Sequence, residues 1–509
     1  MKQYIQRRIH NGQVWLDLVI LGLLLIPLTY GLAHVQAITS DRLSWGDGPW
    51  YLNRALLINR GIWPEFYVYT LGQPVLVSLF ERLTGDVVAA GVLVNRVGTG
   101  LFLIGTYLLG RLFFNRQVGL LAFLMVLCSV FVRILNRLLQ PFMLFYGLTT
   151  ITLIAFWFAI KRPGYWSAFF LGLFLNACFF TRFEGVSYAI LIPIAGLAIY
   201  RQHGWKLALT CVATSSITFL VGFGFYMGVL LNKADPGNGV AFTFLALLQQ
   251  QPFPTEALIQ RLLLTGQSLT FYWSPIIWLV ALLSVIWGLW RRSSVLPYVL
   301  GLTLLAVNFL NQFVLSIEPI FRLSGPVYPV IAVLFVDFWI RLSKRFPAGR
   351  YLIMIPLLSV IIPELFVMMR LSMQTAQDHR AFEAYQTAQA IDQYLTEANL
   401  STREVYTFCD DVALYSRSQL QIIYRVAFRD LDSTAWWNSP ENLFAGMAAN
   451  GSLYMDCENA PIYYRDWRDW IEGKLTTTYR LEPVGEMTGF TFFEAVPNTS
   501  PAADDSSSS

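Results

Sequence analysis

Charged residues are scarce in this chain: they make up 13% of its 509 residues, whereas 55% are hydrophobic. A soluble domain carries roughly a quarter charged residues, so the composition excludes an ordinary water-soluble protein. The net charge of +4 is small and gives no reason to expect nucleic-acid binding. A charged side chain inside an apolar region is therefore a candidate for function.

Metal-binding residue types are also sparse. The four histidines are scattered, and the five cysteines form no Cys-x-x-Cys pair of the kind that holds zinc. The sequence indicates neither a cofactor nor a divalent metal. Cys409 and Cys457 each end a predicted strand in the polar C-terminal part, where a disulfide and two separate thiols both stay open as alternatives.

What the chain has in quantity is apolar runs of about 20 residues, the length at which an α-helix crosses the hydrocarbon core of a bilayer. We expect a polytopic α-helical membrane protein with about eleven transmembrane helices. The predicted spans are 15–35, 87–110, 117–135, 139–160, 165–181, 185–200, 207–231, 270–290, 295–316, 326–340 and 351–369.

Basic residues recur in alternate loops between these spans. With a cytoplasmic N-terminus, as Lys2, Arg7 and Arg8 suggest, the basic loops all face the cytoplasm, which is what the positive-inside rule requires. These loops contain Arg111 and Arg116, Lys161 and Arg162, Arg201 and Lys206, Arg291 and Arg292, and Arg341, Lys344, Arg345 and Arg350. We expect a plasma-membrane (inner-membrane) location, with residues 36–86 and the C-terminal part on the exoplasmic side. Asp337 is near the cytoplasmic end of its span, so we expect its carboxylate to contact water.

The composition becomes more polar after residue 370. Apolar side chains at helical spacing predict an amphipathic helix over 379–395. Short strands are predicted at 405–409, 452–457, 479–484 and 490–496, with a helix at 412–426 between the first two. We therefore expect a membrane domain over 1–370, a small exoplasmic α/β domain over 371–497 and a disordered tail over 498–509.

The first exoplasmic segment concentrates polar and aromatic side chains. Asp41 and Asp47 lie there among Trp45, Trp50 and Tyr51. A structural explanation is open, because Gly-Asp-Gly-Pro favours a turn and tryptophans are common where a membrane meets water. The functional alternative is a sugar site, because aromatic faces stack on sugar rings and a carboxylate can deprotonate a hydroxyl group.

The order of these motifs resembles the GT-C superfamily of polyprenyl-phosphate-sugar-dependent glycosyltransferases, which includes the protein O-mannosyltransferases and the aminoarabinose transferase of lipid A. Asp47-Gly-Pro-Trp-Tyr51 is similar to the family's Asp-Glu-x-x-Tyr motif after the first span. A juxtamembrane helix starting at Gln73-Pro74, the pair Asn95-Arg96 and the stretch Arg322-Leu-Ser-Gly-Pro326 follow in the family's order.

Two positions depart from the family pattern. Gly48 stands where relatives have the second acidic residue, and Gln140 stands where they often have an acidic residue before the fourth span. The resemblance therefore does not carry over a pair of carboxylates or a bound metal.

The resemblance implies a membrane glycosyltransferase that moves a hexose or pentose from a polyprenyl-phosphate donor to an exoplasmic lipid, glycan or protein, with inversion. It implies Asp47 as the base for the acceptor hydroxyl, Asp41 as the reserve candidate, and Arg322 as the cation that holds the donor phosphate. Arg322 can alternatively extend to lipid headgroups without a catalytic role.

Three further charged residues are candidates for this site. Arg182 can bind the phosphate, or it can pair with Glu184 only to close the turn between two spans. Arg137, at the outer end of the third span, can likewise bind the phosphate or extend to lipid headgroups. Glu364 lies inside the last span, where an ionisable residue suggests a sugar or acceptor contact.

Two other functions remain as alternatives. A transporter or flippase of lipid-linked sugars would bind the same lipids, but such proteins commonly consist of two repeated halves, and this chain has no internal repeat. A subunit without catalytic activity is the second alternative, because of Gly48 and Gln140.

Overall fold

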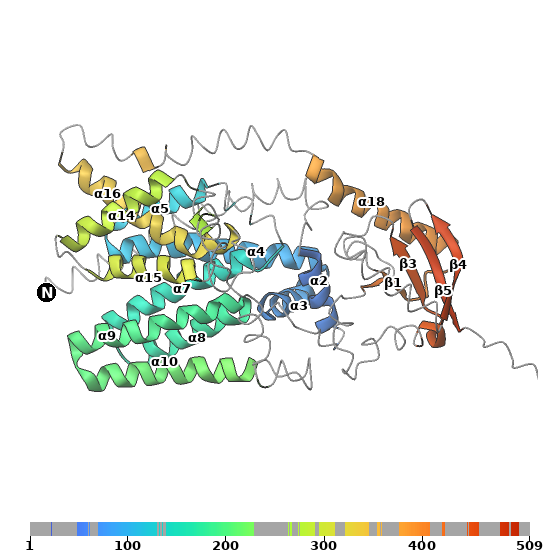
Figure 1. The fold of residues 1–509 in the computed structure, drawn as a ribbon, viewed down its shortest axis with the longest axis horizontal. Helices are drawn as coiled ribbons and strands as arrows, with labels where there is room; N and C mark the ends of the chain where they lie inside the picture. Colours follow the sequence, from blue (N-terminus) through green and yellow to red (C-terminus); the bar gives the residue numbers. More distant parts are fainter. Residues whose placement is uncertain are drawn as a thin grey trace, which may run out of the picture. The chain divides into compact units, whose positions relative to one another are not determined.

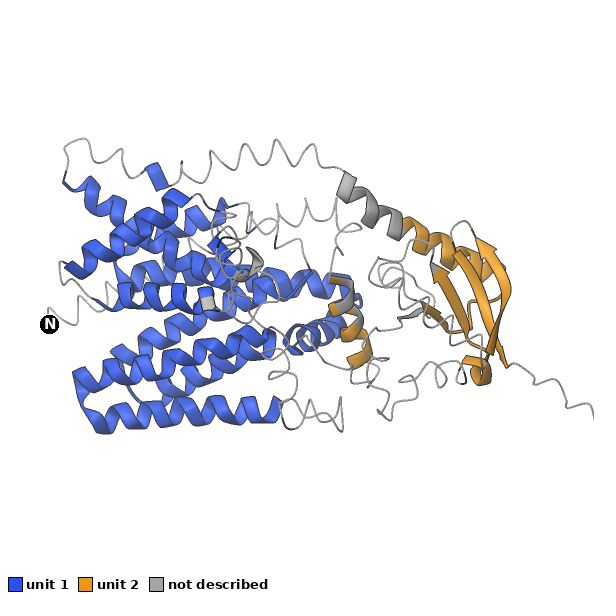
Figure 2. Cartoon of the chain, in the orientation of Figure 1, with its two compact units in different colours: residues 1–40, 68–230, 240–374 blue, residues 41–67, 231–239, 375–509 orange. Residues whose placement is uncertain are grey.

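The computed structural model describes residues 48–59, 70–129, 139–226, 275–290, 295–310, 321–345, 376–407, 420–422, 447–457, 479–487 and 490–497, with a few isolated positions between them. The chain forms two compact units (Figure 2). The first unit contains residues 1–40, 68–230 and 240–374, and the second contains residues 41–67, 231–239 and 375–509.

The first unit is a bundle of apolar helices (Figure 1). Five helical stretches in the described residues are long and apolar enough to cross a membrane: Val87–Phe113, Phe142–Lys161, Phe183–His203, Trp205–Phe225 and Ser324–Ser343. In element terms these are α4 (Val87–Phe113), α7 (Phe142–Lys161), η2 (Phe183–Ile190) with α9 (Leu191–His203), α10 (Trp205–Phe225), and the end of η5 (Phe321–Val327) with α16 (Tyr328–Ser343). Shorter apolar helices are α5 (Arg116–Leu127), α8 (Tyr165–Thr181), α14 (Pro275–Trp290) and α15 (Leu296–Leu310).

These helices coincide with predicted spans, and their ends follow from local sequence. The juxtamembrane helix predicted from Gln73 is α3 (Gly72–Thr84), which ends at Gly85 with a positive φ of 70°. Asp86 then caps α4, because its carboxylate accepts a hydrogen bond of 2.7 Å from the Ala89 amide. The predicted spans 15–35 and 351–369 fall largely outside the described residues.

Glycines allow α4 and α7 to pack backbone against backbone. A Cβ atom at Gly98 of α4 would lie 2.5 Å from the Leu144 nitrogen of α7, and one at Gly147 would lie 2.5 Å from the Gly98 oxygen. Small residues at a helix contact are typical of membrane bundles, where close packing replaces the hydrophobic effect. This contact brings the beginning of α7 beside the first half of α4.

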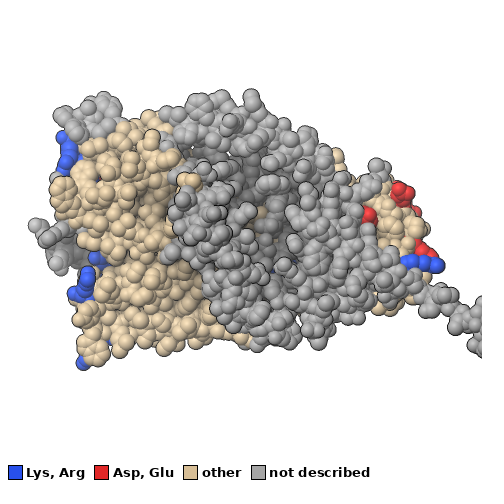
Figure 3. Space-filling model, in the orientation of Figure 1, with Lys and Arg blue, Asp and Glu red and all other residues tan. Residues whose placement is uncertain are grey.

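Lysine and arginine side chains gather at one end of the first unit (Figure 3). Arg111, Lys161, Arg201 and Arg341 lie in the last turns of α4, α7, α9 and α16. These four residues, which were expected to share one side of the membrane, therefore lie at one end of the bundle, while Arg291, Arg292 and Arg350 lie outside the described residues. The polar residues of the Arg182 turn lie at the other ends of these helices, because α8 begins just after α7 and ends at Thr181.

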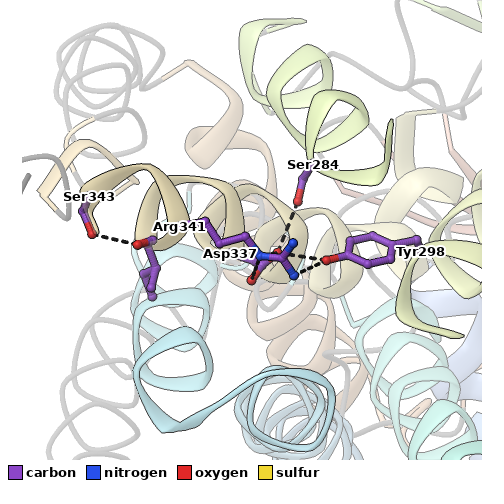
Figure 4. A network of polar contacts seen from close by, with 6 residues as sticks. Ser284, Tyr298, Asp337, Arg341 and Ser343 are labelled. Atoms are coloured by element: carbon purple, nitrogen blue, oxygen red, sulfur yellow. Dashed lines mark hydrogen bonds and ion pairs between the residues drawn. The ribbon is translucent and has the colours of Figure 1, made fainter. Parts of the chain in front are cut away.

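Asp337 lies at the basic end but does not contact water as expected. It is 3% exposed, and its carboxylate accepts hydrogen bonds from Arg341 Nε at 3.0 Å, Tyr298 OH at 3.3 Å and Ser284 Oγ at 3.4 Å (Figure 4). The expectation of a wetted carboxylate was wrong because groups from α14, α15 and α16 replace water around it. The network joins these three helices.

The second unit contains α18 (Ala376–Glu397) and a five-stranded sheet in the order β2-β1-β3-β5-β4. The strands are β1 (Val405–Thr407), β2 (Leu420–Ile422), β3 (Leu453–Cys457), β4 (Tyr479–Met487) and β5 (Phe490–Pro497). β1 pairs in parallel with β2 and β3, whereas β5 is antiparallel to β3 and β4. The core of this unit consists of Ala388, Ile391 and Leu395 of α18 with Val405, Leu453, Met455 and Phe492 of the sheet.

The helix over 379–395 and the four predicted strands are confirmed by α18, β1, β3, β4 and β5. The helix predicted at 412–426 is wrong over Leu420–Ile422, which form the edge strand β2. Parallel pairing with β1 satisfies the backbone of this segment, and its apolar spacing suits a helix as well as a strand. Cys409 and the side chain of Cys457 lie outside the described residues, so a disulfide and two separate thiols both stay open.

Candidate functional site

The predicted site residues differ in how far the structure places them. Asp41, Trp45, Asp47, Arg137 and Glu364 lie outside the described residues. For Trp50 and Arg322 only the backbone is described, in α2 and η5 respectively. Tyr51 and Arg182 are described in full.

Helix α2 (Gly48–Asn59) begins at the residue after Asp47. Pro49 is its second residue, and proline is well tolerated in the first turn of a helix; the turn favoured at Gly46-Asp47 lies outside the described residues. Tyr51 and Arg54 lie one turn apart on α2, and each is 2% exposed. A buried arginine was not expected from the sequence.

Arg182 is held in a defined orientation between α8 and η2. Its guanidinium donates two hydrogen bonds to the Glu184 carboxylate, Nε to Oε2 at 3.1 Å and Nη2 to Oε1 at 2.6 Å. The guanidinium carbon also lies 4.4 Å from the ring centroid of Phe142, the first residue of α7. The carboxylate fixes the cation within its plane and the aromatic ring supports its face. The pairing predicted for Arg182 and Glu184 is thus present.

The backbone around Arg182 is held by tight contacts on both sides. On one side, the Thr70 hydroxyl donates a hydrogen bond to the Thr181 carbonyl, and a Cβ atom at Gly72 would lie 2.6 Å from the Phe180 oxygen. On the other side, a Cβ atom at Gly185 would lie 2.4 Å from the Cys178 carbonyl carbon. The α8–η2 turn therefore has little room to shift.

The Arg322 segment reaches the same part of α7. A Cβ atom at Gly325 of η5 would lie 2.2 Å from Cζ of Tyr146, so the η5 backbone rests against this ring. Tyr146 lies one turn after Phe142, and the centroids of their rings are 6.2 Å apart. Two arginine motifs that are distant in sequence thus meet on the first two turns of α7. We call the group formed by Phe142, Tyr146, Arg182, Glu184 and Gly325 the α7 arginine site.

Tyr188 links this site to α15. Its side chain is 1% exposed and packs edge-on against Phe145 of α7, with ring centroids 6.1 Å apart. Its hydroxyl lies beside the Asn308 side chain of α15 and near the Glu184 carboxylate. Segments η2, α7 and α15 therefore converge here, and η5 contacts both α7 and α15. The 3₁₀-helical segments η2 and η5 interrupt the regular helices, a feature that often accompanies binding sites in membrane proteins.

The sequence did not reveal the two aromatic residues of the site, Phe142 and Tyr146, or the buried side-chain amide of Gln73. Phe142 and Tyr146 lie in a strongly apolar run, so only their long-range contacts distinguish them from core aromatics. Gln73, next to Gly72, is fully buried, and neither atom of its amide has a hydrogen-bond partner among the described residues. A buried amide without partners is costly, and the only signal in the sequence was the position of Gln73 at the predicted start of the juxtamembrane helix. Within the described ranges, no three His, Cys, Asp or Glu side chains gather as a metal site would require.

Comparisons with known proteins support the fold. No family model and no curated protein sequence matches the chain. The crystal structure of ArnT from Cupriavidus metallidurans bound to undecaprenyl phosphate matches with a TM-score of 0.58 at 12% identity, over 92% of this chain and 97% of ArnT. ArnT in the apo state gives 0.57 at 12% identity, over 92% and 98% of the two chains. The apo oligosaccharyltransferase of Archaeoglobus fulgidus gives 0.49 at 12% identity, over 87% and 66%. The two ArnT matches show that the chain has the fold of ArnT, the GT-C fold that the sequence motifs resemble.

Proposed function

We propose that this chain is an integral-membrane glycosyltransferase that binds a polyprenyl-phosphate sugar at the α7 arginine site and transfers the sugar to an exoplasmic acceptor. The observation that carries the proposal is the meeting of the Arg182 turn and the Arg322 segment on one end of α7. The fold of ArnT, whose crystal structure holds undecaprenyl phosphate, supports the class of donor.

The residues at this site suit the reaction. When the bond between the anomeric carbon and the phosphate oxygen breaks, polyprenyl phosphate leaves with an additional negative charge. A fixed cation stabilises that charge more effectively than a mobile one, because it needs no reorganisation during the reaction. Arg182 supplies such a cation, and we assign the same role to Arg322, with Arg137 as a further candidate.

The acceptor must lose a proton as its oxygen attacks the anomeric carbon. We assign Asp47 as the base that takes this proton, with Asp41 in reserve. A single displacement of this kind inverts the anomeric configuration. Trp45, Trp50 and Tyr51 are the candidates for contact with the sugar, and Glu364 is a candidate for contact with the acceptor.

The membrane orientation follows from the distribution of basic residues. Lys and Arg gather at the end of the bundle opposite the Arg182 turn. We assign this basic end to the cytoplasm. The α7 arginine site is then on the exoplasmic side of the plasma membrane. We also propose about eleven spans and a cytoplasmic N-terminus, as the sequence suggests.

Two measurements on the purified chain test the proposal. The first is the affinity for undecaprenyl phosphate in lipid nanodiscs, compared with undecaprenol, which has the same tail without phosphate. We expect the wild type to prefer the phosphate and Arg182→Ala to lose that preference. Arg201→Ala is the matched control, because Arg201 is an exposed arginine in the last turn of α9 at the opposite end of the bundle. No preference in the wild type contradicts the proposal.

The second measurement is sugar transfer in detergent solution, where no membrane separates two compartments. A transferase converts a polyprenyl-phosphate sugar and its acceptor into products under these conditions. A transporter or flippase of lipid-linked sugars binds the lipid but leaves its chemistry unchanged. Transfer in detergent therefore supports the enzyme, and binding without transfer supports the alternative.

A further inference from the structure

Glu184 places a negative charge directly against the cation to which we assign phosphate binding. Taken alone, this carboxylate would be expected to weaken the attraction of Arg182 for an anion. The geometry of the pair suggests a different effect. Both carboxylate oxygens are engaged, one by Nε and one by Nη2, so the carboxylate sets the plane in which the guanidinium lies.

We propose that Glu184 is a positioning residue of the donor site, a role that rests on the proposed function: it holds the Arg182 guanidinium against Phe142 so that the donor phosphate meets a cation already in place. Both side chains are partly accessible, Arg182 at 16% and Glu184 at 20%, so a ligand can approach the pair. A guanidinium has five N–H donors, and the Glu184 carboxylate engages the guanidinium through Nε and Nη2.

Glu184 is the more firmly anchored partner of the two. It lies in the first turn of η2, where the partial positive charge of a helix N-terminus favours an acidic residue. The Ser187 hydroxyl donates a hydrogen bond of 2.7 Å to the Glu184 carbonyl, and the close contact of Gly185 with Cys178 holds the next residue. Arg182 has the longer and more flexible side chain. Because the Glu184 backbone is fixed and its side chain is the shorter of the two, we infer that the carboxylate orients the arginine rather than the reverse.

Tyr188 lies in η2, the same segment as Glu184, and extends this arrangement towards α15. Its hydroxyl interacts electrostatically with Glu184 and lies beside Asn308 of α15. Since α15 contacts η5, the segments that carry Glu184 and Arg322 both lie beside α15.

The test uses the full chain in nanodiscs, with undecaprenyl phosphate and undecaprenol as the two probes. We expect Glu184→Ala to weaken binding of undecaprenyl phosphate about tenfold, because the guanidinium must then be ordered during binding. Glu184→Gln retains one acceptor oxygen and should lose less. Neither variant should change the affinity for undecaprenol.

A double variant separates positioning from a purely structural role. In an Arg182→Ala background, Glu184→Ala should have no further effect on the preference for phosphate, because there is no guanidinium left to orient. A further loss there, or equal losses for the two probes, would overturn the positioning role. Unchanged or tighter phosphate binding by Glu184→Ala, with Arg182→Ala still defective, also overturns it but leaves the proposed function standing. If the wild type shows no preference for phosphate, the proposed function fails, and this inference fails with it.

Discussion

The substitution Gly325→Ala tests whether the Arg322 segment is held against α7. The added methyl group would lie 2.2 Å from Cζ of Tyr146, whereas carbon atoms in contact are about 3.5–4.0 Å apart. Tyr146 is fully buried, so its ring has no open space to enter. Either the ring or η5 must therefore move by more than about 1 Å.

Overpacking of this kind costs about 1–3 kcal/mol. We expect Gly325→Ala to lower the midpoint of thermal unfolding in detergent and to weaken binding of undecaprenyl phosphate, because the Arg322 backbone is displaced. Gly100→Ala is the matched control, since a Cβ atom at Gly100 of α4 has nothing within 4 Å. That control should be neutral or stabilise the protein by up to about 1 kcal/mol, as alanine favours a helix over glycine.

A second substitution checks the cause. Tyr146→Leu removes the ring atoms that the new methyl group meets, so the double variant should be more stable than the sum of the two single losses. Unchanged stability and binding in Gly325→Ala would refute the contact between η5 and α7. Additive losses in the double variant would show that the damage arises elsewhere.

Three further predictions concern other parts of the chain. Asp337→Ala should destabilise the first unit by about 1–3 kcal/mol, because Arg341 and Tyr298 lose their acceptor, while the affinity for undecaprenyl phosphate stays unchanged. Asn176→Leu should lower the unfolding midpoint, because the Asn176 amide donates a 2.7 Å hydrogen bond to the Thr218 carbonyl between α8 and α10, and wild-type stability in this variant would contradict that link. Burial and, to a lesser extent, the adjacent Glu404 carboxylate raise the pKa of Tyr406 above its usual value of 10.0. The tyrosine of the unfolded chain therefore loses its proton at a lower pH than the tyrosine of the folded protein. The stability that Tyr406 contributes is present below about pH 10 and falls above it. We expect circular dichroism between about pH 9 and about pH 12, a range around the usual tyrosine pKa, to show a smaller loss of folded protein in Tyr406→Phe than in the wild type. Equal losses in the two proteins would contradict this.

The local sequence predicts the helices well and the packing between them poorly. The boundaries of α8 follow from an apolar run bounded by Pro163-Gly164 and Arg182. The glycine contacts between α4 and α7 could not be predicted, because a glycine in an apolar run does not reveal which helix it faces. The strand β2 was missed for a related reason: its pairing with β1 is a contact between separate segments.

The same distinction applies to the candidate site. Arg182 and Glu184 were identifiable because two charges beside an apolar run are conspicuous and lie within hydrogen-bonding reach along the chain. Phe142 and Gly325 were not identifiable, because their importance comes from Arg182 and Tyr146, which are remote in sequence. Asp337 was misjudged because its distance from the end of the span suggested water, whereas Tyr298 and Ser284 come from other helices.

We propose that the chain transfers a sugar from a lipid phosphate with Asp47 as the base. The most direct test is mass spectrometry of the glycolipids and glycoproteins of cells that carry the wild-type gene, no gene, or the Asp47→Asn variant at equal protein level. We predict a species that carries one additional sugar in the wild type and is missing from both other strains. Identical spectra from all three strains would contradict the account.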